Sequence, residues 1–548
     1  MSPRFEIALA TLAILVIPVA IIAFNWAGED CWITYRYAEN FGEGHGLVFN
    51  PGDTDAESRV EGYSNPSLTV MLGVIHWLGG SVVYGSRWIA ILSAALTVWL
   101  LGRFSITWLG AGKARWLCLL APALFALHPL VQYQIGRALE TTLHTALLVV
   151  AALMWLRGRP LGTSLALGLV ALTRPEGFLF IAPFVAVWAL EWWFSRSERG
   201  SRLDWAALAW LVIPWALIVA AIFLWRHAHY GHWFPNSVTL KTTPGSAGSS
   251  LRLVRNFVIS WSFLPLAVPL ACAGFREMSA IQRRGLLLCG FLMAHQLVFI
   301  IAVGDVAASA YRHFIPIIPF ACLCLARVAD LMLASIAWRP LRAYLILALM
   351  AASIFTVSNG DGSRTRLHVR LREFVHGYGG EWNSPISQFA FHWRWFHSPP
   401  IRIDTRAGLW MREHLPPDAL VAADQMGQLA YHAGQPMLDL FGLMDEHIAR
   451  AGLDLNYVFA RNPDFVVFMW WVPSGDYTPF QQPLRDDPRF GERYRLRWRL
   501  RLDNGPYEVN RFHIFVRRDL DDGLPVEDVL LPGSFEESER FWRVWEGS

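Results

Sequence analysis

Three carboxylates flank a long polar segment near the N-terminus. Glu29 and Asp30 come directly after the first apolar run, and Glu61 stands shortly before the next run begins at Pro66. A carboxylate at a membrane surface can act as a general base on an acceptor hydroxyl when a lipid-linked substrate presents its head group at that depth. These three residues are therefore the candidate catalytic set. The alternative is that the acids only offset the dipole at the start of a helix.

Charged and polar side chains recur at the ends of the apolar runs that follow. Arginine and lysine can hold phosphate, because both form charge-assisted hydrogen bonds with it. The candidates for binding a donor phosphate are Arg36, Arg174, Lys241, Arg312 and Asn236. The candidates for a substrate pocket are Tyr37, Asn40, Tyr63, Asn65, Glu140, Glu176, His232 and Asp305. Charges at membrane depth are costly, so their convergence on one side favours a functional site.

Each of these residues also has a structural interpretation. A cation at a helix end can be an interface anchor, and Glu140 with Arg174 can form an internal ion pair. Three histidines between residues 227 and 232 suggest a metal site, but their spacing runs through Gly231 and Pro235 without a further ligand set. We expect no metal ligands and no required cofactor, and leave open whether a divalent ion takes part.

The composition indicates a membrane protein. Hydrophobic residues make up 54% of the chain and charged residues 17%, against about 25% charged in soluble domains. Many of the 27 tryptophans lie near the ends of apolar runs, as expected at a membrane interface. No basic patch for nucleic acid is visible. Five of the six cysteines lie in or beside apolar runs, so we expect no disulfides.

The apolar runs predict about eleven transmembrane helices. The first run, 5–26, is long and lacks a cleavage pattern, so it is interpreted as a retained span. Later runs cover 66–80, 87–108, 116–131, 139–156, 161–173, 177–193, 205–225, 257–275, 284–303, 313–335 and 341–358. Run 66–80 is short and ends in Gly79-Gly80. We expect it to be a juxtamembrane helix along the outer interface.

Basic residues indicate the orientation, since short loops rich in Lys and Arg stay in the cytoplasm. They occupy every second loop, at 113–115, 157–159, 196–202, 276–284 and 339–342. The N-terminus is then cytoplasmic, and the first loop, residues 27–85, lies outside. Residues 1–358 form the transmembrane module. Residues 359–548, with short strand-like stretches and Pro-rich joints, form a soluble α/β domain that is also outside.

These motifs resemble those of the C-type (GT-C) glycosyltransferases that use polyprenyl-phosphate sugars, and among them the mycobacterial terminal β-(1→2) arabinofuranosyltransferase group. The similar segments span nearly the whole chain and are residues 29–40, 44–50, 60–66, 139–141, 174–177, 230–241, 424–431 and 439–445. The first-loop segments are long and specific. The Arg174-Pro-Glu-Gly piece would be weak by itself.

The resemblance implies an inverting glycosyltransferase of the bacterial inner membrane, with its active site and C-terminal domain in the periplasm. Its donor would be a polyprenyl-phosphate sugar, most directly arabinofuranose, and its acceptor a glycan, glycolipid or glycoprotein. The chain departs from the family at Glu29, where an aspartate is usual, and at Asp305, where valine follows instead of tryptophan. Asp30 matches the family, so we expect it to be the base, supported by Glu29 and Glu61.

A transporter or flippase of lipid-linked sugars is the alternative function. Such a protein would also bind phosphate with intramembrane cations. Transporters usually show internal repeats and midplane charges, whereas this chain shows no repeat and its charges gather at the outer ends of the runs. A non-catalytic scaffold would not need the acidic first loop. The sequence therefore favours an enzyme.

Overall fold

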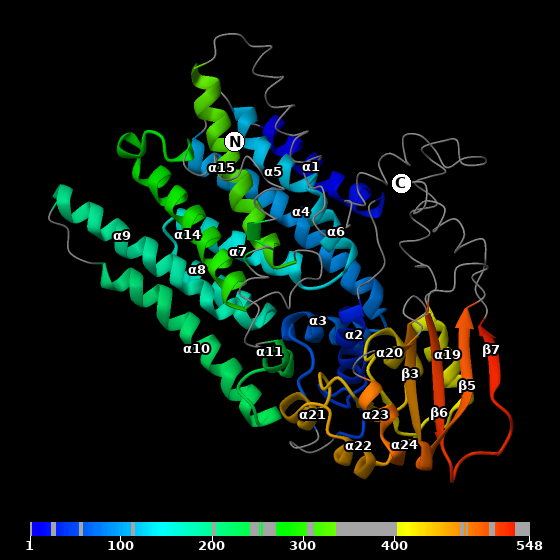
Figure 1. The fold of residues 1–548 in the computed structure, drawn as a ribbon. Helices are drawn as coiled ribbons and strands as arrows, with labels where there is room; N and C mark the ends of the chain where they lie inside the picture. The colour runs from blue at the N-terminus through cyan, green and yellow to red at the C-terminus, as the bar shows by residue number, and fades with distance from the viewer. Residues whose placement is uncertain are drawn as a thin grey trace, which may run out of the picture.

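Two parts of the protein lie side by side in the computed structural model (Figure 1). Helices before residue 336 form a bundle, and residues 403–531 form a seven-stranded sheet with its covering helices. The structure describes residues 3–22, 29–53, 59–110, 115–199, 204–241, 251, 254–255, 270–303, 312–335, 403–471, 476–477, 481–502 and 510–531.

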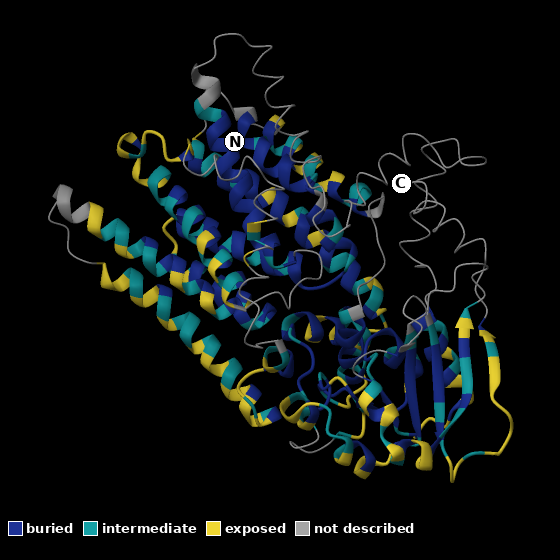
Figure 2. Cartoon of the chain, viewed as in Figure 1, coloured by how far each residue is buried: buried dark blue, intermediate teal, exposed yellow. Residues whose placement is uncertain are grey.

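The bundle consists of apolar helices. They are α1 (Pro3–Ile22), α4 (Val82–Leu109), α5 (Leu120–Ala126), α6 (Pro129–Gly136), α7 (Thr141–Leu156), α8 (Pro160–Thr173), α9 (Ile181–Arg199), α10 (Trp205–Tyr230), α14 (Ala280–Val303) and α15 (Ile318–Ser335), with the 3-10 helices η1 (Arg115–Leu119), η2 (Pro175–Phe180), η3 (Phe275–Glu277) and η5 (Arg312–Ile317). Helices α4, α7 and α15 are largely buried, whereas in α10 only Leu211, Arg226 and Tyr230 are buried and the rest is exposed or partly exposed (Figure 2). An exposed helix that is apolar all round is typical of a membrane span.

Five of the described helical segments are long and apolar enough to cross a membrane, or six when the bent pair α5 and α6 counts as one span. Five spans expected from the sequence are not among these six. The runs 139–156 and 161–173 correspond to α7 and α8, which are shorter apolar helices of 16 and 14 residues, and the run 5–26 corresponds to α1, which is not among the candidate spans. The run 341–358 lies outside the described residues, as does most of the run 257–275. The predicted polytopic helical architecture with a C-terminal α/β domain agrees with the structure, and the number eleven stays a prediction.

The first loop contains two helices that pack against each other, α2 (Glu29–Gly42) and α3 (Pro66–Trp77). Gly44 and Gly46 follow α2 with φ angles of +91° and +90°, a left-handed conformation that glycine adopts without steric cost. They turn the chain back. Helix α3 has 12 residues, about 18 Å at 1.5 Å per residue, which is too short to cross a hydrocarbon core of about 30 Å.

The C-terminal domain is built on a mixed sheet. Its strands are β1 (Val421–Ala423), β2 (Met437–Asp439), β3 (Phe465–Trp471), β4 (Asp476–Tyr477), β5 (Tyr494–Leu502), β6 (Asn510–Arg517) and β7 (Glu527–Leu531), in the order β2-β1-β3-β6-β5-β7 with β4 beside β3. Parallel pairs join β1 to β2 and β3, and β5 to β7, while β6 is antiparallel to both neighbours. The helices are α19 (Ile403–His414), α20 (Gln428–Ala433), α21 (Glu446–Ala451), α22 (Leu455–Arg461), α23 (Gln482–Asp486) and α24 (Pro488–Arg493).

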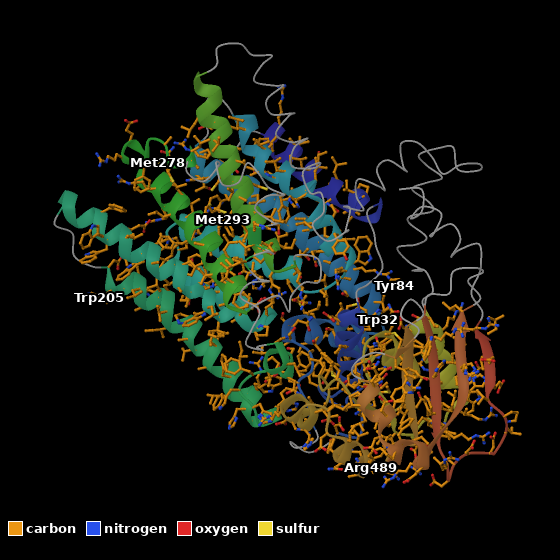
Figure 3. The ribbon with its side chains drawn as sticks, in the orientation of Figure 1. Trp32, Tyr84, Trp205, Met278, Met293 and Arg489 are labelled. Atoms are coloured by element: carbon orange, nitrogen blue, oxygen red, sulfur yellow. The ribbon has the colours of Figure 1, made fainter. Side chains whose placement is uncertain are left out.

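The first loop and the C-terminal domain share one hydrophobic core. Tyr37, Phe49 and Tyr63 of the loop belong to the same buried cluster as side chains of α19, β1, β3 and β6. Trp32, which lies at the junction of the two parts (Figure 3), has its ring centroid 4.9 Å from that of Tyr431 in α20. The predicted division at residue 358 lies outside the described residues, and the described parts on either side of it share this core.

Arg36 joins the first loop to the C-terminal domain. Its Nη1 and Nη2 donate to the carbonyl oxygens of Ala430 and Gln435 at 2.5 and 2.8 Å, and its Nε donates to that of Phe49 at 2.8 Å. Burial lowers the pKa of Arg36 to about 10, so the side chain stays charged at neutral pH. The prediction that Arg36 binds phosphate does not fit this environment, because every guanidinium nitrogen already donates within the protein.

Glu61 ties the same loop to α10. Arg226 donates from Nε to Oε2 of Glu61 at 2.5 Å and from Nη2 to Oε1 at 3.1 Å, a bidentate pair. The hydroxyl groups of Tyr63 and Tyr230 lie 2.9 Å apart beside it. Burial raises the pKa of Glu61 to about 6, and Arg226 acts against that shift. Glu61 is thus a buried acid paired with Arg226, and its predicted role as a supporting catalytic carboxylate stays a prediction.

Replacing Arg36 with Met is expected to destabilise the packing of the C-terminal domain on the loop. The carbonyls of Ala430 and Gln435 would lose their donors, at about 1–3 kcal/mol for each buried group left unsatisfied. Thermal unfolding in detergent, with limited proteolysis of the C-terminal domain, measures this loss. Arg450→Met is the control, since exposed ion pairs such as the one with Glu446 contribute about 0–1 kcal/mol. Equal melting temperatures for the two variants would contradict the assignment.

Replacing Arg226 with Met is expected to cost about 3–5 kcal/mol at neutral pH, because Glu61 would stay buried without its cation. The folded-state pKa of Glu61 lies above its ordinary value of 4.5, so its ionisation lowers the free energy of unfolding as the pH rises from about 4.5 through about 6. Removing the cation raises that pKa further. Arg226→Met should therefore be more harmful at pH 8 than at pH 5.

The double variant Arg226→Met/Glu61→Gln is the control for this pH dependence. It has no carboxyl group at position 61, so its melting temperature should change between pH 5 and pH 8 less than that of the single variant. Parallel melting curves for the single and double variants across this range would show that Glu61 is not the titrating group.

Candidate functional site

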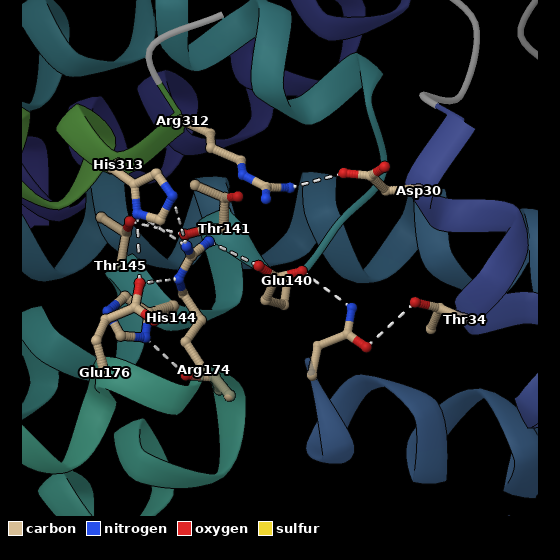
Figure 4. Close-up of polar contacts among 12 residues, drawn as sticks. Asp30, Thr34, Glu140, Thr141, His144, Thr145, Arg174, Glu176, Arg312 and His313 are labelled. Carbon is tan, nitrogen blue, oxygen red and sulfur yellow. Dashed lines mark hydrogen bonds and ion pairs between the residues drawn. The ribbon is translucent and has the colours of Figure 1, made fainter. Parts of the chain in front are cut away.

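Asp30 and Arg312 meet where the start of α2 lies beside η5 (Figure 4). Nη1 of Arg312 donates to Oδ2 of Asp30 at 3.0 Å. The Asp30 side chain is 45% exposed and that of Arg312 is 10% exposed, so the acid is accessible while its cation is nearly buried. Nε of Arg312 has no hydrogen-bond partner among the described residues. The pair combines an accessible acid or base with a cation that has a donor to spare.

Arg174 lies at the centre of a buried charge cluster. Its Nη1 contacts Oε1 of Glu140 at 2.7 Å, and its Nε contacts Oε1 of Glu176 at 2.6 Å. Nη2 donates to Nδ1 of His313 at 3.0 Å. The side chains of Glu140 and Glu176 are 4% and 8% exposed. The ion pair between Glu140 and Arg174 that the sequence suggests is confirmed, and each nitrogen of Arg174 already donates, which leaves it little capacity for phosphate.

Asn65 connects this cluster to α2. Its Nδ2 donates to Oε2 of Glu140 at 3.0 Å, and its Oδ1 accepts from the hydroxyls of Thr34 and Thr69 at 3.1 and 3.2 Å. Thr34 stands four residues, or about one helical turn, after Asp30. The contacts therefore close into a ring. This polar ring consists of Asp30, Thr34, Asn65, Glu140, Arg174, His313 and Arg312.

Helix ends bring most of the ring together. Asn65 precedes α3, Glu140 precedes α7, Arg174 separates α8 from η2, and Arg312 begins η5. The backbone of Arg174 is extended, with φ −152° and ψ 148°, as expected for a residue before proline. Gly177 lies so close to the carbonyl of Val170 in α8 that a β-carbon would not fit. Pro175 thus ends α8, and Gly177 lets the next turn fold back on it.

Four other predicted site residues have structural contacts away from the ring. His232 contacts Glu446 and Arg450 of α21. Asn40 and Tyr37 donate to backbone carbonyls of the first loop, and Tyr63 pairs with Tyr230. These contacts stabilise the loop and its packing on the C-terminal domain, and the predicted place of the four side chains in a substrate pocket stays a prediction.

The remaining predicted residues cannot be joined to the ring. Asn236 is buried at the start of α11 (Asn236–Lys241), and its backbone N–H donates to the carbonyl of Glu61 at 3.1 Å. Glu29 and Lys241 lie in α2 and α11, but their side chains are outside the described part of the structure. Asp305 is outside it altogether. Their predicted roles stay predictions.

Sequence reasoning missed three members or neighbours of the ring. His313 directly follows Arg312, Thr34 stands four residues after Asp30, and Thr69 stands four residues after Asn65. Helical spacing from the predicted residues was the signal that could have found the two threonines. Among the residues that the structure describes, no group of three or more His, Cys, Asp or Glu side chains could hold a metal ion.

Two buried hydroxyls at the start of α7 add donors to this region. Oγ1 of Thr141 and of Thr142 have no hydrogen-bond partner within the described ranges. Figure 4 shows Thr141 between Arg312 and Arg174, and α7 packs against η5. The first amides of a helix also lack partners inside the helix and favour an anion. The region beside Arg312 thus contains buried donors that have no partner among the described residues.

Comparison with known proteins shows the fold. No curated protein matches the chain. A family model described as a domain of unknown function (DUF8728) matches residues 397–515, within the C-terminal part. Two solved structures are similar over most of the chain, with TM-scores of 0.53. ArnT from Cupriavidus metallidurans bound to undecaprenyl phosphate has 14% identity, with 94% of this chain and 98% of ArnT covered.

The second structure is the apo oligosaccharyltransferase of Archaeoglobus fulgidus, with 12% identity and 87% of this chain and 74% of that chain covered. The mycobacterial arabinofuranosyltransferase AftD reaches a TM-score of 0.46 at 14% identity, with 94% of this chain and 40% of AftD covered, which is too weak a likeness to support a choice of sugar. The chain is therefore a multi-pass membrane protein with the GT-C fold that ArnT and the archaeal oligosaccharyltransferase share.

Proposed function

We propose that the protein transfers a sugar from a polyprenyl phosphate to an acceptor hydroxyl, with Asp30 as the general base. The observation that carries this proposal is the Asp30–Arg312 pair. A carboxylate that is 45% exposed lies 3.0 Å from a nearly buried guanidinium. The other two ring-side acids, Glu140 and Glu176, are buried against Arg174 and are not accessible to a substrate in the same way.

In the proposed reaction the acceptor oxygen attacks the anomeric carbon of the donor sugar and the bond from that carbon to the phosphate oxygen breaks. The configuration at the anomeric carbon inverts. Asp30 takes the acceptor proton, and the polyprenyl phosphate leaves with the bonding electrons. The leaving group needs no proton, because cations beside it can stabilise its charge. The chemistry therefore has no obligatory step for a metal ion.

Arg312 is the residue that we assign to the departing phosphate. It holds Asp30 through Nη1, and its Nε has no partner among the described residues. The Thr141 hydroxyl and the first amides of α7 supply further donors on the same side. Lys241 is a further cation for this role from the sequence. We expect Arg174 to hold the site in place without contacting the phosphate, because its nitrogens already donate to Glu140, Glu176 and His313.

The shared fold supports a lipid phosphate as the ligand class. ArnT was solved with undecaprenyl phosphate, and the archaeal oligosaccharyltransferase was solved with a dolichol-phosphate and an inhibitory peptide. We carry the lipid-phosphate class over to this chain on that basis. Arabinofuranose as the sugar and a glycan as the acceptor follow from the sequence resemblance. The site and the C-terminal domain would face the periplasm of a bacterial inner membrane, as the basic loops indicate.

Replacing Asp30 with Asn is expected to lower sugar transfer about 10²–10⁴-fold, the usual contribution of a general base. The assay follows radiolabelled pentose from synthetic polyprenyl-phosphate arabinofuranose onto a synthetic arabinofuranoside, with purified protein in detergent. Glu43→Gln is the matched control, because Glu43 is a half-exposed acid of the same loop that contacts only histidines in its described ion pairs. Its rate should stay near that of the wild type.

Two results would contradict the proposal. An Asp30→Asn protein that is folded and transfers sugar at the wild-type rate would remove Asp30 from the base role. A wild-type protein that transfers neither pentose nor hexose, but moves the labelled lipid across vesicle membranes, would replace the enzyme with a flippase.

A further inference from the structure

We propose that Asn65 is a positioning residue that sets the place of the catalytic base by fixing the turn of α2 between Asp30 and Thr34 to the buried Glu140–Arg174 pair. Asn65 touches no reacting atom in this proposal. The inference rests on the proposed function, since it assumes that Asp30 takes the acceptor proton. It assigns Asn65 a role that differs from the substrate contact expected from the sequence.

The contacts of Asn65 require an amide. Its oxygen accepts from the hydroxyls of Thr34 and Thr69, and its nitrogen donates to the carboxylate of Glu140. Asn65 is buried, with 2% of its surface exposed, so water cannot replace a lost partner. Aspartate would place a second carboxylate against Glu140, and leucine would satisfy none of the three neighbours. The asparagine amide satisfies all three, because its oxygen accepts from the two threonine hydroxyls and its nitrogen donates to the Glu140 carboxylate.

The ring explains how a buried amide controls an exposed acid. Arg312 reaches Asp30 from η5, and the next residue, His313, accepts from Arg174. Asn65 reaches the same Arg174 through Glu140 from the side of α2. Both Asp30 and Arg312 are therefore connected to the buried guanidinium of Arg174, one through Asn65 and Glu140 and the other through His313. Loss of the Asn65 link lets the first turns of α2 move against η5, and with them the base, while Arg36 still holds the later turns of α2 to the C-terminal domain.

The charged surroundings decide what an added carboxylate would do at position 65. Glu140 is the direct neighbour, and Arg174 lies behind it with Glu176 and His313. Asp30 stands on α2 across the ring with Arg312. The other charged or histidine side chains on the packed elements are Glu29, Arg36 and Glu39 of α2, His76 of α3, Arg87 and Arg103 of α4 and His144 of α7, and α8 carries none. A carboxyl group introduced at position 65 would share one proton with Glu140 at low pH, and the two groups would repel each other once it is lost.

The test compares the pH dependence of transfer in three variants. At low pH the introduced carboxyl group and Glu140 share a proton, so Asn65→Asp should transfer sugar at a rate near that of the wild type. As the pH rises and the contact between position 65 and Glu140 breaks, its rate should fall on the order of 100-fold relative to the wild type. Asn65→Leu should be slow at every pH. The KM for the lipid donor should change little in both, since the effect falls on kcat.

Asn65→Asp/Glu140→Gln exchanges the amide and the acid across the same contact and should regain the pH profile of the wild type.

A second measurement does not depend on activity. Trp32 stands between Asp30 and Thr34 in α2. In protein labelled with 5-fluorotryptophan, and with the signal assigned by Trp32→Phe, the fluorine resonance of Trp32 should move with pH in Asn65→Asp more than in the wild type. If the wild type transfers no sugar, the proposed function fails, and this signal still decides whether Asn65 fixes α2.

Either of two outcomes would overturn the role of Asn65. One is an Asn65→Asp protein with the rate, pH profile and Trp32 resonance of the wild type. The other is a loss of rate in Asn65→Asp and Asn65→Leu that matches the loss of folded protein at every pH and is not relieved by the exchange variant. The second result would make Asn65 a stabilising residue without influence on the base.

Discussion

Compensation of buried charge is the constraint on which this site depends. A guanidinium buried without partners costs several kcal/mol, so Arg174 must be surrounded by groups that accept from it. Those groups come from the start of α7, from η2 and from η5. Satisfying one arginine therefore fixes three helix ends relative to one another. The accessible Asp30 lies at the border of this arrangement, where it pairs with Arg312.

Residue type and position along the sequence predicted part of the site. The rest depends on hydrogen-bond partners that are distant in the sequence. Glu140, Arg174 and Arg312 stand at the ends of apolar runs, where charges are expected to pair, and the structure joins them through Arg174 and His313. Arg36 has the same chemistry, yet its partner Gln435 is 399 residues away. No local pattern can identify such a contact. The strand order of the sheet is non-local for the same reason, whereas hydropathy alone predicts the apolar helices.

The shared core changes the meaning of the C-terminal domain. The family model matches residues 397–515. The strands and helices in that range share a hydrophobic core with Tyr37 and Phe49 of the first loop. A domain cut from the chain would expose that apolar face to water, which favours aggregation. The loop that carries Asp30 is, in turn, held by Arg36 on one side and by Arg226 on the other. The proposed acid and the domain beside it form one structural unit.

The bond from Arg36 to Gln435 also bears on how the protein is made. At about 5–20 residues per second, the ribosome reaches Gln435 roughly 20–80 s after Arg36. Throughout that interval Ile33 and Phe49 lack the partners that later bury them. The last strands to be synthesised therefore complete a core that the first loop began.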